Sequence, residues 1–324
     1  MKYCIALMFF FLAVSAQSRI ITDDYGRQVN VPERIASIYA ASPPLTMSVV
    51  AFDPSLVCAL NVPMSDTQKR YAGAAAARPV AGGFFGQGNT PNYEIIAAAK
   101  PDVILMWGKM TGYQNALTKL SALHIPVIMV RNDSINDLIG QFELLGKLTG
   151  NTRRSDALVS YTKETLGMIE SLQSKIDARK AVRYYFAEGS DGMSSECDGS
   201  FHLEPFGYAG GKNALSCKMS SNFGMEKMSM ETILMADPDV IVAMEPSFAE
   251  SVVQDPRWQN LRAVKNRRVL SVPSIPFNTI SRPPSFMRLL GIRWLIHSFY
   301  PDLIGPMESE QRRFDKLFFP FYKG

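Results

Sequence analysis

A repeated segment constrains the fold of this chain more than any other feature. Residues 92–105, Asn-Tyr-Glu-Ile-Ile-Ala-Ala-Ala-Lys-Pro-Asp-Val-Ile-Leu, are echoed by residues 229–242, Ser-Met-Glu-Thr-Ile-Leu-Met-Ala-Asp-Pro-Asp-Val-Ile-Val, 137 residues further on. Each copy predicts a short helix that ends before the proline, followed by an apolar run typical of a buried parallel strand. Two copies at this distance indicate two similar α/β lobes, because a solenoid would repeat every 20 to 50 residues or so.

The residues around the two copies continue the alternation of strands and helices. In the first lobe we expect strands at residues 35–39 and 125–130, and a helix over 135–148 that ends at Gly150. In the second lobe we expect strands at 181–186 and 268–272, and a closing amphipathic helix from Pro284 to Phe299. Alternation of this kind indicates parallel sheets covered by helices, and therefore the α/β fold class.

A long helical pattern separates the two lobes. It runs over residues 152–176, and its apolar stripe consists of Leu158, Tyr161, Leu166, Ile169, Leu172 and Ile176. A helix of about 25 residues is roughly 37 Å long, which suits a connection between lobes. We therefore predict a first lobe at residues 17–150, a connecting helix at 151–178 and a second lobe at 179–324.

The first residues have the pattern of a secretory signal. Lys2 precedes an apolar run from Ile5 to Val14, and the small residues Ser15 and Ala16 follow. This pattern predicts that residues 1–16 are a signal peptide cleaved after Ala16; a buried N-terminal helix is the alternative. The run is short for a membrane span, and Cys4 precedes it, whereas the acylated cysteine of a lipoprotein follows its apolar run. We expect an exported, periplasmic protein without direct membrane insertion.

Export permits disulfides, and the cysteines suit one. Cys197 and Cys217 lie twenty residues apart and flank a glycine-rich loop. We predict that they are bridged, which would stabilise the fold by roughly 3 kcal/mol. A metal site on the two cysteines is the alternative, but it lacks a Cys-x-x-Cys spacing or a companion cysteine. Cys58 lies in an apolar segment and is expected to be a buried free thiol.

Charge and motifs exclude several classes of function. The net charge of +4 comes without a long Lys/Arg run, so we expect no nucleic-acid partner. The chain lacks a Gly-x-Ser-x-Gly elbow, a His-Glu-x-x-His motif and a P-loop. The glycine-rich segment 82–88 lacks the lysine and the strand-to-helix context of a phosphate loop. We predict no catalytic residues and no cofactor; an exported two-domain enzyme is the alternative from a different class.

Several loose motifs, in order along the chain, resemble one family. They are residues 21–27 with 31–37, 92–94 with 100–104, 209–214, and 237–241. In this order the chain resembles the periplasmic substrate-binding proteins of ABC importers that carry iron-siderophores, haem, cobalamin and related metal chelates. The resemblance implies a monomer of two Rossmann-like lobes, joined by one long rigid helix, with a ligand cleft between the lobes. In that family one glutamate on each lobe meets an arginine pocket on the permease dimer, which works with ATPase subunits, and Glu94 and Glu231 match these positions.

The solute is expected to bring its own metal ligands. A bare transition metal needs three or four convergent His, Cys or carboxylate groups, and none is evident, so we predict no metal site. A chelate of the iron-siderophore type fits better; a nickel or cobalt chelate, cobalamin and a molybdate-type oxyanion are alternatives. Because such a chelate needs aromatic walls and arginine donors, the candidate ligand-binding residues are Tyr39, Phe84, Phe85, Trp107 and Arg282. His202, in the loop between Cys197 and Cys217, is a further candidate.

Two other histidines and a group of methionines are assigned structural roles. His124 stands where the family more often has glycine, and we interpret it as a surface turn residue and not a metal ligand. His297, beside Trp294 and Phe299 on the closing helix, is expected to be structural. The methionines between Met219 and Met235 suggest copper(I) only weakly, because methionine more often fills cores.

Overall fold

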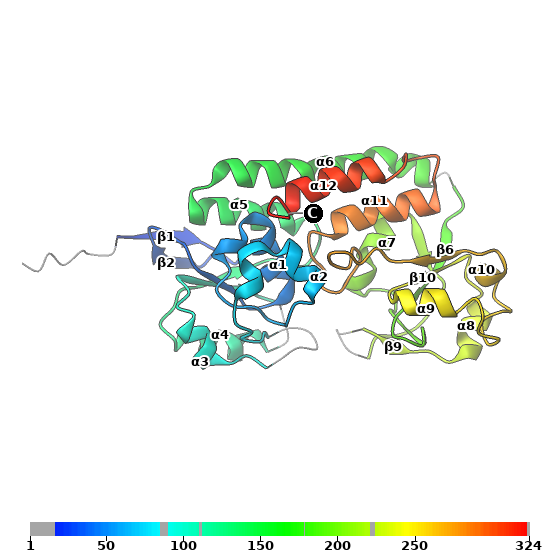
Figure 1. The fold of residues 1–324 in the computed structure, drawn as a ribbon, viewed down its shortest axis with the longest axis horizontal. Coiled ribbons are helices and arrows are strands. Elements are labelled where there is room, and N and C mark those ends of the chain that lie inside the picture. The colour runs from blue at the N-terminus through cyan, green and yellow to red at the C-terminus, as the bar shows by residue number, and fades with distance from the viewer. Residues whose placement is uncertain (1–16, 85–89, 110–111, 178, 221–223, 323–324) are drawn as a thin grey trace, which may run out of the picture.

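The computed structural model of the chain describes residues 17–84, 90–109, 112–177, 179–220 and 224–322. The predicted signal peptide (residues 1–16) and the candidate ligand residue Phe85 therefore lie outside the described residues. Figure 1 shows two lobes side by side below a long helix that reaches over both.

The first lobe is built on a short parallel sheet. Its strand order is β3 (Ile38–Ala40), β4 (Val103–Trp107) and β5 (Val127–Val130). An antiparallel hairpin of β1 (Ser18–Thr22) and β2 (Gln28–Pro32) precedes it. The helices of this lobe are α1 (Pro43–Phe52), α2 (Asp66–Tyr71), α3 (Tyr93–Ala98), α4 (Tyr113–Ser121) and α5 (Asp137–Thr149). Gly150 ends α5 with a φ of 75°, a left-handed conformation that glycine adopts without steric cost.

The second lobe has a four-stranded parallel sheet. Its order is β11 (Val269–Ser271), β10 (Val240–Ala243), β6 (Val182–Ala187) and β8 (Gly211–Asn213). A small antiparallel pair, β7 (Ser194–Ser195) and β9 (Glu226–Lys227), lies beside it. The helices are α7 (Glu204–Tyr208), α8 (Met230–Ala236), α9 (Pro246–Ser251), α10 (Arg262–Lys265), α11 (Arg288–Phe299) and α12 (Glu308–Phe318). The predicted α/β class with two parallel sheets is confirmed.

The sequence repeat has a shared structural role in the two lobes. Its copies form α3 with β4 and α8 with β10, and the residue before each proline, Lys100 or Asp237, adopts a positive φ that ends the helix. The aspartate after each proline then fixes the neighbouring strand. Asp102 accepts the backbone N–H groups just before β3, and Asp239 accepts that of Arg183 in β6 (2.7–3.0 Å). The repeated Pro-Asp pair thus aligns two adjacent parallel strands in each lobe.

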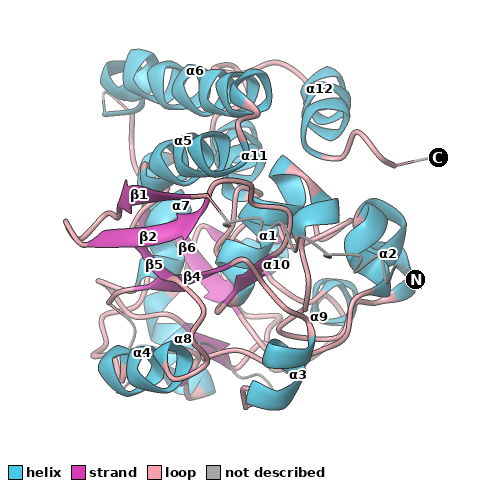
Figure 2. Cartoon of the chain, turned by 90° about the vertical axis from the view of Figure 1, so that its left-hand side faces the viewer, coloured by secondary structure: helices cyan, strands magenta, loops and turns pink. Residues whose placement is uncertain are grey.

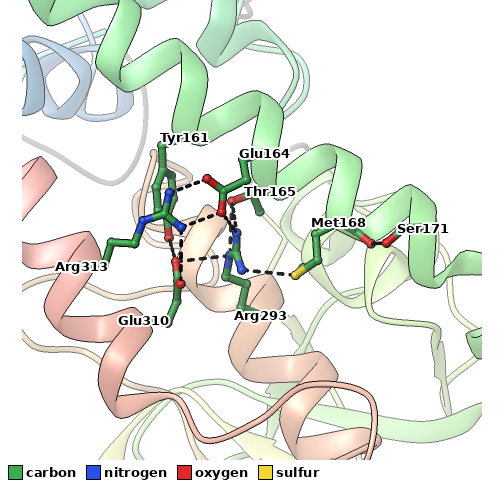
Figure 3. A network of polar contacts seen from close by, with 8 residues as sticks. All are labelled: Tyr161, Glu164, Thr165, Met168, Ser171, Arg293, Glu310 and Arg313. Carbon is green, nitrogen blue, oxygen red and sulfur yellow. Dashed lines mark hydrogen bonds and ion pairs between the residues drawn. The ribbon is translucent and has the colours of Figure 1, made fainter.

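The long helix is α6 (Thr152–Asp177), close to its predicted position. Figure 2 shows α5, α6, α11 and α12 on one side of the strands, as a helical layer shared by both lobes. Side chains of this layer form the polar network in Figure 3, in which Arg293 of α11 donates to Thr165 of α6 (3.0 Å) and Arg313 of α12 pairs with Glu164 (2.6 Å). Within the described ranges, no helix has the length and apolar character that crossing a membrane requires.

The end of the chain departs from the predicted division into lobes. The sequence predicts a second lobe over residues 179–324, yet α12 packs against the first lobe. The ring of Phe318 packs against Phe142 of α5 (centroids 6.3 Å apart), and Arg154 donates to the carbonyl of Leu317 (2.7 Å). Phe314, Phe318 and Phe319 are buried there. The physical reason is that these aromatic side chains find an apolar surface on the first lobe.

The closing helix also differs from its prediction. It begins at Arg288 instead of Pro284, and it is buried around most of its circumference instead of being amphipathic. The charged side chain of Arg293 is also buried, against α6. The reason is that α11 lies between α7 and α6, so both of its faces are covered.

The predicted disulfide is confirmed. Cys197 and Cys217 are bridged, and Cys58 is a buried free thiol. The bridge closes a loop with a sequence separation of 20 residues on the side of the second lobe that holds β7 and β9.

Loss of this bridge should destabilise the fold without abolishing it. We expect Cys197→Ser/Cys217→Ser to lower the free energy of unfolding by about 3 kcal/mol, because the unfolded chain regains the entropy of the open loop. Urea unfolding followed by circular dichroism measures this change, with Cys58→Ser as the control that leaves the bridge intact. Titration of thiols in unfolded, unreduced protein lacking residues 1–16 should find one thiol; three would contradict the bridge.

Candidate functional site

The candidate site lies where the carboxyl ends of the two sheets meet. In open α/β sheets, ligands bind beyond the carboxyl ends of the strands. In the first lobe β4 ends at Trp107, and in the second lobe β6 leads directly into Glu188. The ring of Trp107 meets that of Phe201, from the second lobe, edge to face with centroids 6.2 Å apart. This contact brings the two sets of strand ends to one boundary.

Trp107 is held from within the first lobe. Its indole N–H donates to Asp133 Oδ1 (3.0 Å), and the other oxygen of Asp133 pairs with Lys109 (2.8 Å). Asp133 follows β5, the neighbouring strand of the sheet. The ends of β4 and β5 together therefore orient the ring of Trp107 toward the second lobe.

Arg282 joins two buried carboxyl groups on the second lobe. Its Nε lies 2.7 Å from Glu188 Oε1, and its Nη2 lies 2.6 Å from Glu196 Oε1. Both glutamate side chains are fully buried, whereas a quarter of the Arg282 side chain is exposed. Glu196 also accepts the Ser200 hydroxyl (2.7 Å) and the backbone N–H of Met225 (3.1 Å). We call Glu188, Glu196 and Arg282 the arginine fork.

Glu188 is the member of the arginine fork that holds a proton. Burial and, to a lesser extent, the nearby Glu196 carboxylate raise the pKa of Glu188 while Arg282 opposes the shift, so that the pKa of Glu188 lies at about 8. Glu188 therefore carries a proton at neutral pH. The proton on Glu188 reduces the negative charge that faces the guanidinium of Arg282.

His202 lies beside the arginine fork. Its Nδ1 forms a hydrogen bond with the hydroxyl of Ser281, the residue before Arg282, and both side chains are buried. Burial, together with the charges of Arg282 and Arg288, lowers the pKa of His202 to about 2. The imidazole is therefore neutral at any physiological pH.

The donors needed for a bare metal ion are missing from the described residues. Nowhere in those ranges do three His, Cys, Asp or Glu side chains gather in a way that could hold a metal ion. His124 is exposed in a turn with a φ of 56°, as the interpretation as a turn residue requires. His297 is half-buried, and its ring bonds to the carbonyl of Ile304 (3.1 Å).

Direct bonds also join the lobes near the site. Glu204 of α7 accepts the backbone N–H of Ile135 in the first lobe (2.9 Å) and pairs with Arg288 of α11 (2.6 Å). The Asn136 amide donates to the Tyr208 hydroxyl (3.2 Å). These bonds fix the spacing of the lobes at the end of β5.

The predicted ligand residues fall into different positions. Trp107, His202 and Arg282 lie at the lobe boundary. Tyr39 is fully buried and donates its hydroxyl to the carbonyl of Gly82 (2.8 Å), so in this structure it holds the segment that leads to Phe84. Phe84 packs edge-on against Tyr93, at the start of α3, with ring centroids 6.0 Å apart.

Sequence reasoning missed the acidic members of the site. Glu188, Glu196 and Asp133 were not singled out, although Glu188 immediately follows a predicted strand of the second lobe. A polar residue at the carboxyl end of a buried strand is the signal that could have found it. Glu196 carries no such signal, because only the fold brings it to Arg282.

Hollows elsewhere on the described surface do not contain these residues. One of about 560 Å³ lies at the amino ends of the first sheet, where Ser37, Cys58 and Arg78 line it. Another of about 640 Å³ lies on the surface of α5 and α6. A third of about 70 Å³, between Asn61 and Pro283, is smaller than the roughly 300 Å³ of the smallest typical ligand pockets. The placement of the candidate site at the strand ends rests on the strand positions and the contacts described above, and not on these hollows.

The proton on Glu188 should make stability depend on pH. Because the native state holds this proton more tightly than the unfolded chain, stability should fall as the pH rises from 4.5 to about 8. Glu188→Gln should flatten this part of the profile, since an amide does not titrate. Melting temperatures across this range measure the effect, with the exposed Glu143→Gln as the control. An unchanged slope in Glu188→Gln would contradict the assignment of the proton.

Comparison with known proteins supports a role in solute binding. Residues 67–276 match the family model described as "Periplasmic binding protein". A solved structure, an ABC transporter solute binding protein from Sulfurospirillum deleyianum, is 31% identical, with 93% of this chain and 95% of that chain covered and a TM-score of 0.85. The molybdate-binding protein MolA of Haemophilus influenzae is 23% identical, with 90% of this chain and 88% of MolA covered.

One further relative is named for a different solute, and a solved structure of MolA shares the fold. The Fe(3+) dicitrate-binding periplasmic protein FecB of Escherichia coli is 25% identical over 57% of this chain and 60% of FecB. The structure of MolA bound to molybdate shares the fold with a TM-score of 0.73, at 20% identity, with 93% of this chain and 98% of that chain covered. The chain belongs to the periplasmic binding protein family and is a solute-binding protein of an ABC importer, not an enzyme.

Proposed function

We propose that the solute is a metal chelate of the iron-siderophore type, held between the lobes by Trp107, His202 and Arg282. The observation that carries this proposal is the lack of a metal-binding cluster in the described ranges, combined with an aromatic ring at the lobe boundary. A solute that brings its own metal ligands needs no such cluster. It needs flat apolar surface and a few fixed donors, which an indole ring and a partly exposed guanidinium supply.

The electrical balance of the arginine fork favours a bulky chelate over a small oxyanion. A compact dianion such as molybdate is stabilised by uncompensated positive charge and convergent donors. Arg282 instead already has two carboxyl partners, at 2.7 and 2.6 Å. A chelate spreads its charge over many oxygens, so a nearly neutral wall with a few donors suits it better.

Molybdate is the second candidate, because the likeness to MolA extends over 90% of this chain and 88% of MolA. Nickel or cobalt chelates and cobalamin complete the set of solutes to compare.

We also propose that residues 1–16 are a signal peptide cleaved after Ala16, and that the exported protein is a monomer with the lobe boundaries given above, except that α12 packs on the first lobe.

A panel of solutes should separate the candidates. We expect quenching of Trp107 fluorescence by a ferric catecholate chelate at micromolar concentration or below, and at least tenfold weaker binding of molybdate, cyanocobalamin and nickel–histidine. Trp107→Phe should lose most of the quenching, whereas binding measured by calorimetry should weaken only partly, because the phenyl ring keeps an aromatic face but lacks the bond to Asp133. Tightest binding of molybdate would contradict the chelate proposal in favour of the second candidate. Native mass spectrometry of protein from its own periplasm would identify the solute directly.

We propose that Glu94 and Glu231 contact the permease dimer. Both side chains are exposed in the first turn of their helices, and α3 and α8 lie on the side of the molecule away from α6 (Figure 1). Each helix already has a side-chain cap, from Asn92 or Ser229. The helix dipole alone would also favour these carboxylates by a few tenths of a kcal/mol. Their matched positions on two lobes support a contact with two equivalent subunits.

Loss of both glutamates should separate docking from solute binding. Charged contacts at the rim of an interface mainly set the orientation and rate of association. We expect Glu94→Ala/Glu231→Ala to bind the solute normally but to fail to stimulate the ATPase of the importer in proteoliposomes. Glu143→Ala, on α5 beside α6, is the matched control and should stimulate normally. Full stimulation by the double variant would leave only the helix-dipole role.

A further inference from the structure

The bond between His202 and Ser281 fixes which ring nitrogen of His202 carries the hydrogen. His202 belongs to the short 3-10 helix Phe201–Leu203, and Ser281 lies in the segment that precedes α11. The Nδ1 atom and the Ser281 hydroxyl form a hydrogen bond, and the two residues are 2% and 0% exposed. Either atom is able to donate to the other, so the surrounding contacts decide the direction.

The direction of this hydrogen bond follows from the acceptors that are available to the Ser281 hydroxyl. Within the described ranges, Ser281 Oγ has no hydrogen-bond partner other than His202. A buried hydroxyl hydrogen without an acceptor costs free energy, so Ser281 donates to Nδ1, which must then be unprotonated. A neutral imidazole keeps one hydrogen, which therefore lies on Nε2. The low pKa of His202 agrees with a ring that is never doubly protonated at physiological pH.

The Nε2 atom is left for an external partner. No hydrogen bond to it occurs in the described part of the chain, and it is not among the buried polar atoms that are sealed from solvent without a partner. The neighbouring Phe201 meets Trp107 of the first lobe, and Arg282 follows Ser281 directly. Nε2 therefore keeps a small contact with solvent at the lobe boundary, beside the arginine fork, although His202 as a whole is buried.

We propose that His202 recognises the solute as a neutral hydrogen-bond donor, through Nε2–H to an acceptor oxygen, and does not bind its metal. This inference rests on the proposed function and narrows it. A histidine that binds a metal through Nε2 needs a lone pair there, and so carries its hydrogen on Nδ1, where an acceptor holds it. In His202 the Ser281 hydroxyl donates to Nδ1, so the lone pair lies on Nδ1 and the hydrogen on Nε2. The solute is thus a chelate whose metal coordination is complete and whose outer oxygens face the second lobe.

His297 provides an internal contrast. Its Nδ1 lies 3.1 Å from the carbonyl oxygen of Ile304, which only accepts hydrogen bonds. His297 therefore carries a hydrogen on Nδ1, and when neutral it has the opposite tautomer to His202. With His124 exposed in a turn, the three histidines of the chain occupy distinguishable environments.

Long-range ¹H–¹⁵N spectra of protein labelled at histidine test the tautomer without any solute. We expect His202 to show the Nε2–H pattern unchanged from pH 5 to 8, and His297 to keep a hydrogen on Nδ1. His124→Gln and His297→Gln assign the signals. Ser281→Ala should let a population of the Nδ1–H tautomer appear at His202. An Nδ1–H pattern or a titration at His202 in the unchanged protein would overturn the inference.

Binding variants then test recognition. With the ferric catecholate chelate as probe, His202→Gln should bind within about threefold of the unchanged protein, because the amide supplies a donor, whereas His202→Leu should bind at least tenfold more weakly. The matched control His124→Gln should bind normally. Binding by His202→Leu as tight as that of the unchanged protein would overturn the donor role. So would a change in the absorption of the bound ferric centre that the unchanged protein causes and that both His202 variants lose, because it would mean that His202 binds the metal. If no chelate in the panel binds, the proposed function fails, while the tautomer is still decided by the spectra.

Discussion

The arginine fork is the interaction on which the second half of the site depends. Arg282 connects Glu188, at the end of β6, with Glu196, next to the disulfide, and Glu196 in turn holds the Ser200 hydroxyl and the backbone of Met225. Arg282 and the carboxylate of Glu196 thus connect residues 188–200 with Met225 and with the segment before α11. Gly224 is required beside it, because a Cβ there would lie 2.0 Å from the Glu196 carboxylate. A buried group of this kind is costly to break, since each carboxyl would lose its partner.

A second set of contacts determines how far the lobes are free to move. The helix α6 carries both lobes, and α11 and α12 are tied to it by the network of Arg293, Arg313 and Glu164 (Figure 3). Near the site, Glu204 joins α7 to the first lobe through Ile135. Because these connections span the boundary at both ends, solute binding is expected to act mainly on side chains and loops there, with only modest closure of the lobes.

At the lobe boundary, the second lobe presents hydrogen-bond donors that carry little net charge. Glu188 holds a proton, His202 is neutral, and Arg282 is paired, so the second lobe offers N–H groups without a strong positive field. The first lobe contributes the ring of Trp107, oriented by Asp133. Such a wall fits the bulky chelate that we propose as the solute.

The sequence by itself determined the parts of the protein that depend on local pattern. The repeat at residues 92–105 and 229–242 predicted both helix–strand units, the stripe on residues 152–176 predicted α6, and the spacing of Cys197 and Cys217 predicted the bridge. Tertiary structure alone decided the rest. The return of α12 to the first lobe, the burial of α11, and the meeting of Glu196 with Arg282 join residues far apart in the chain. Periodicity reports which face of an element is apolar, but not which distant surface or charge it meets, because that depends on how whole elements pack.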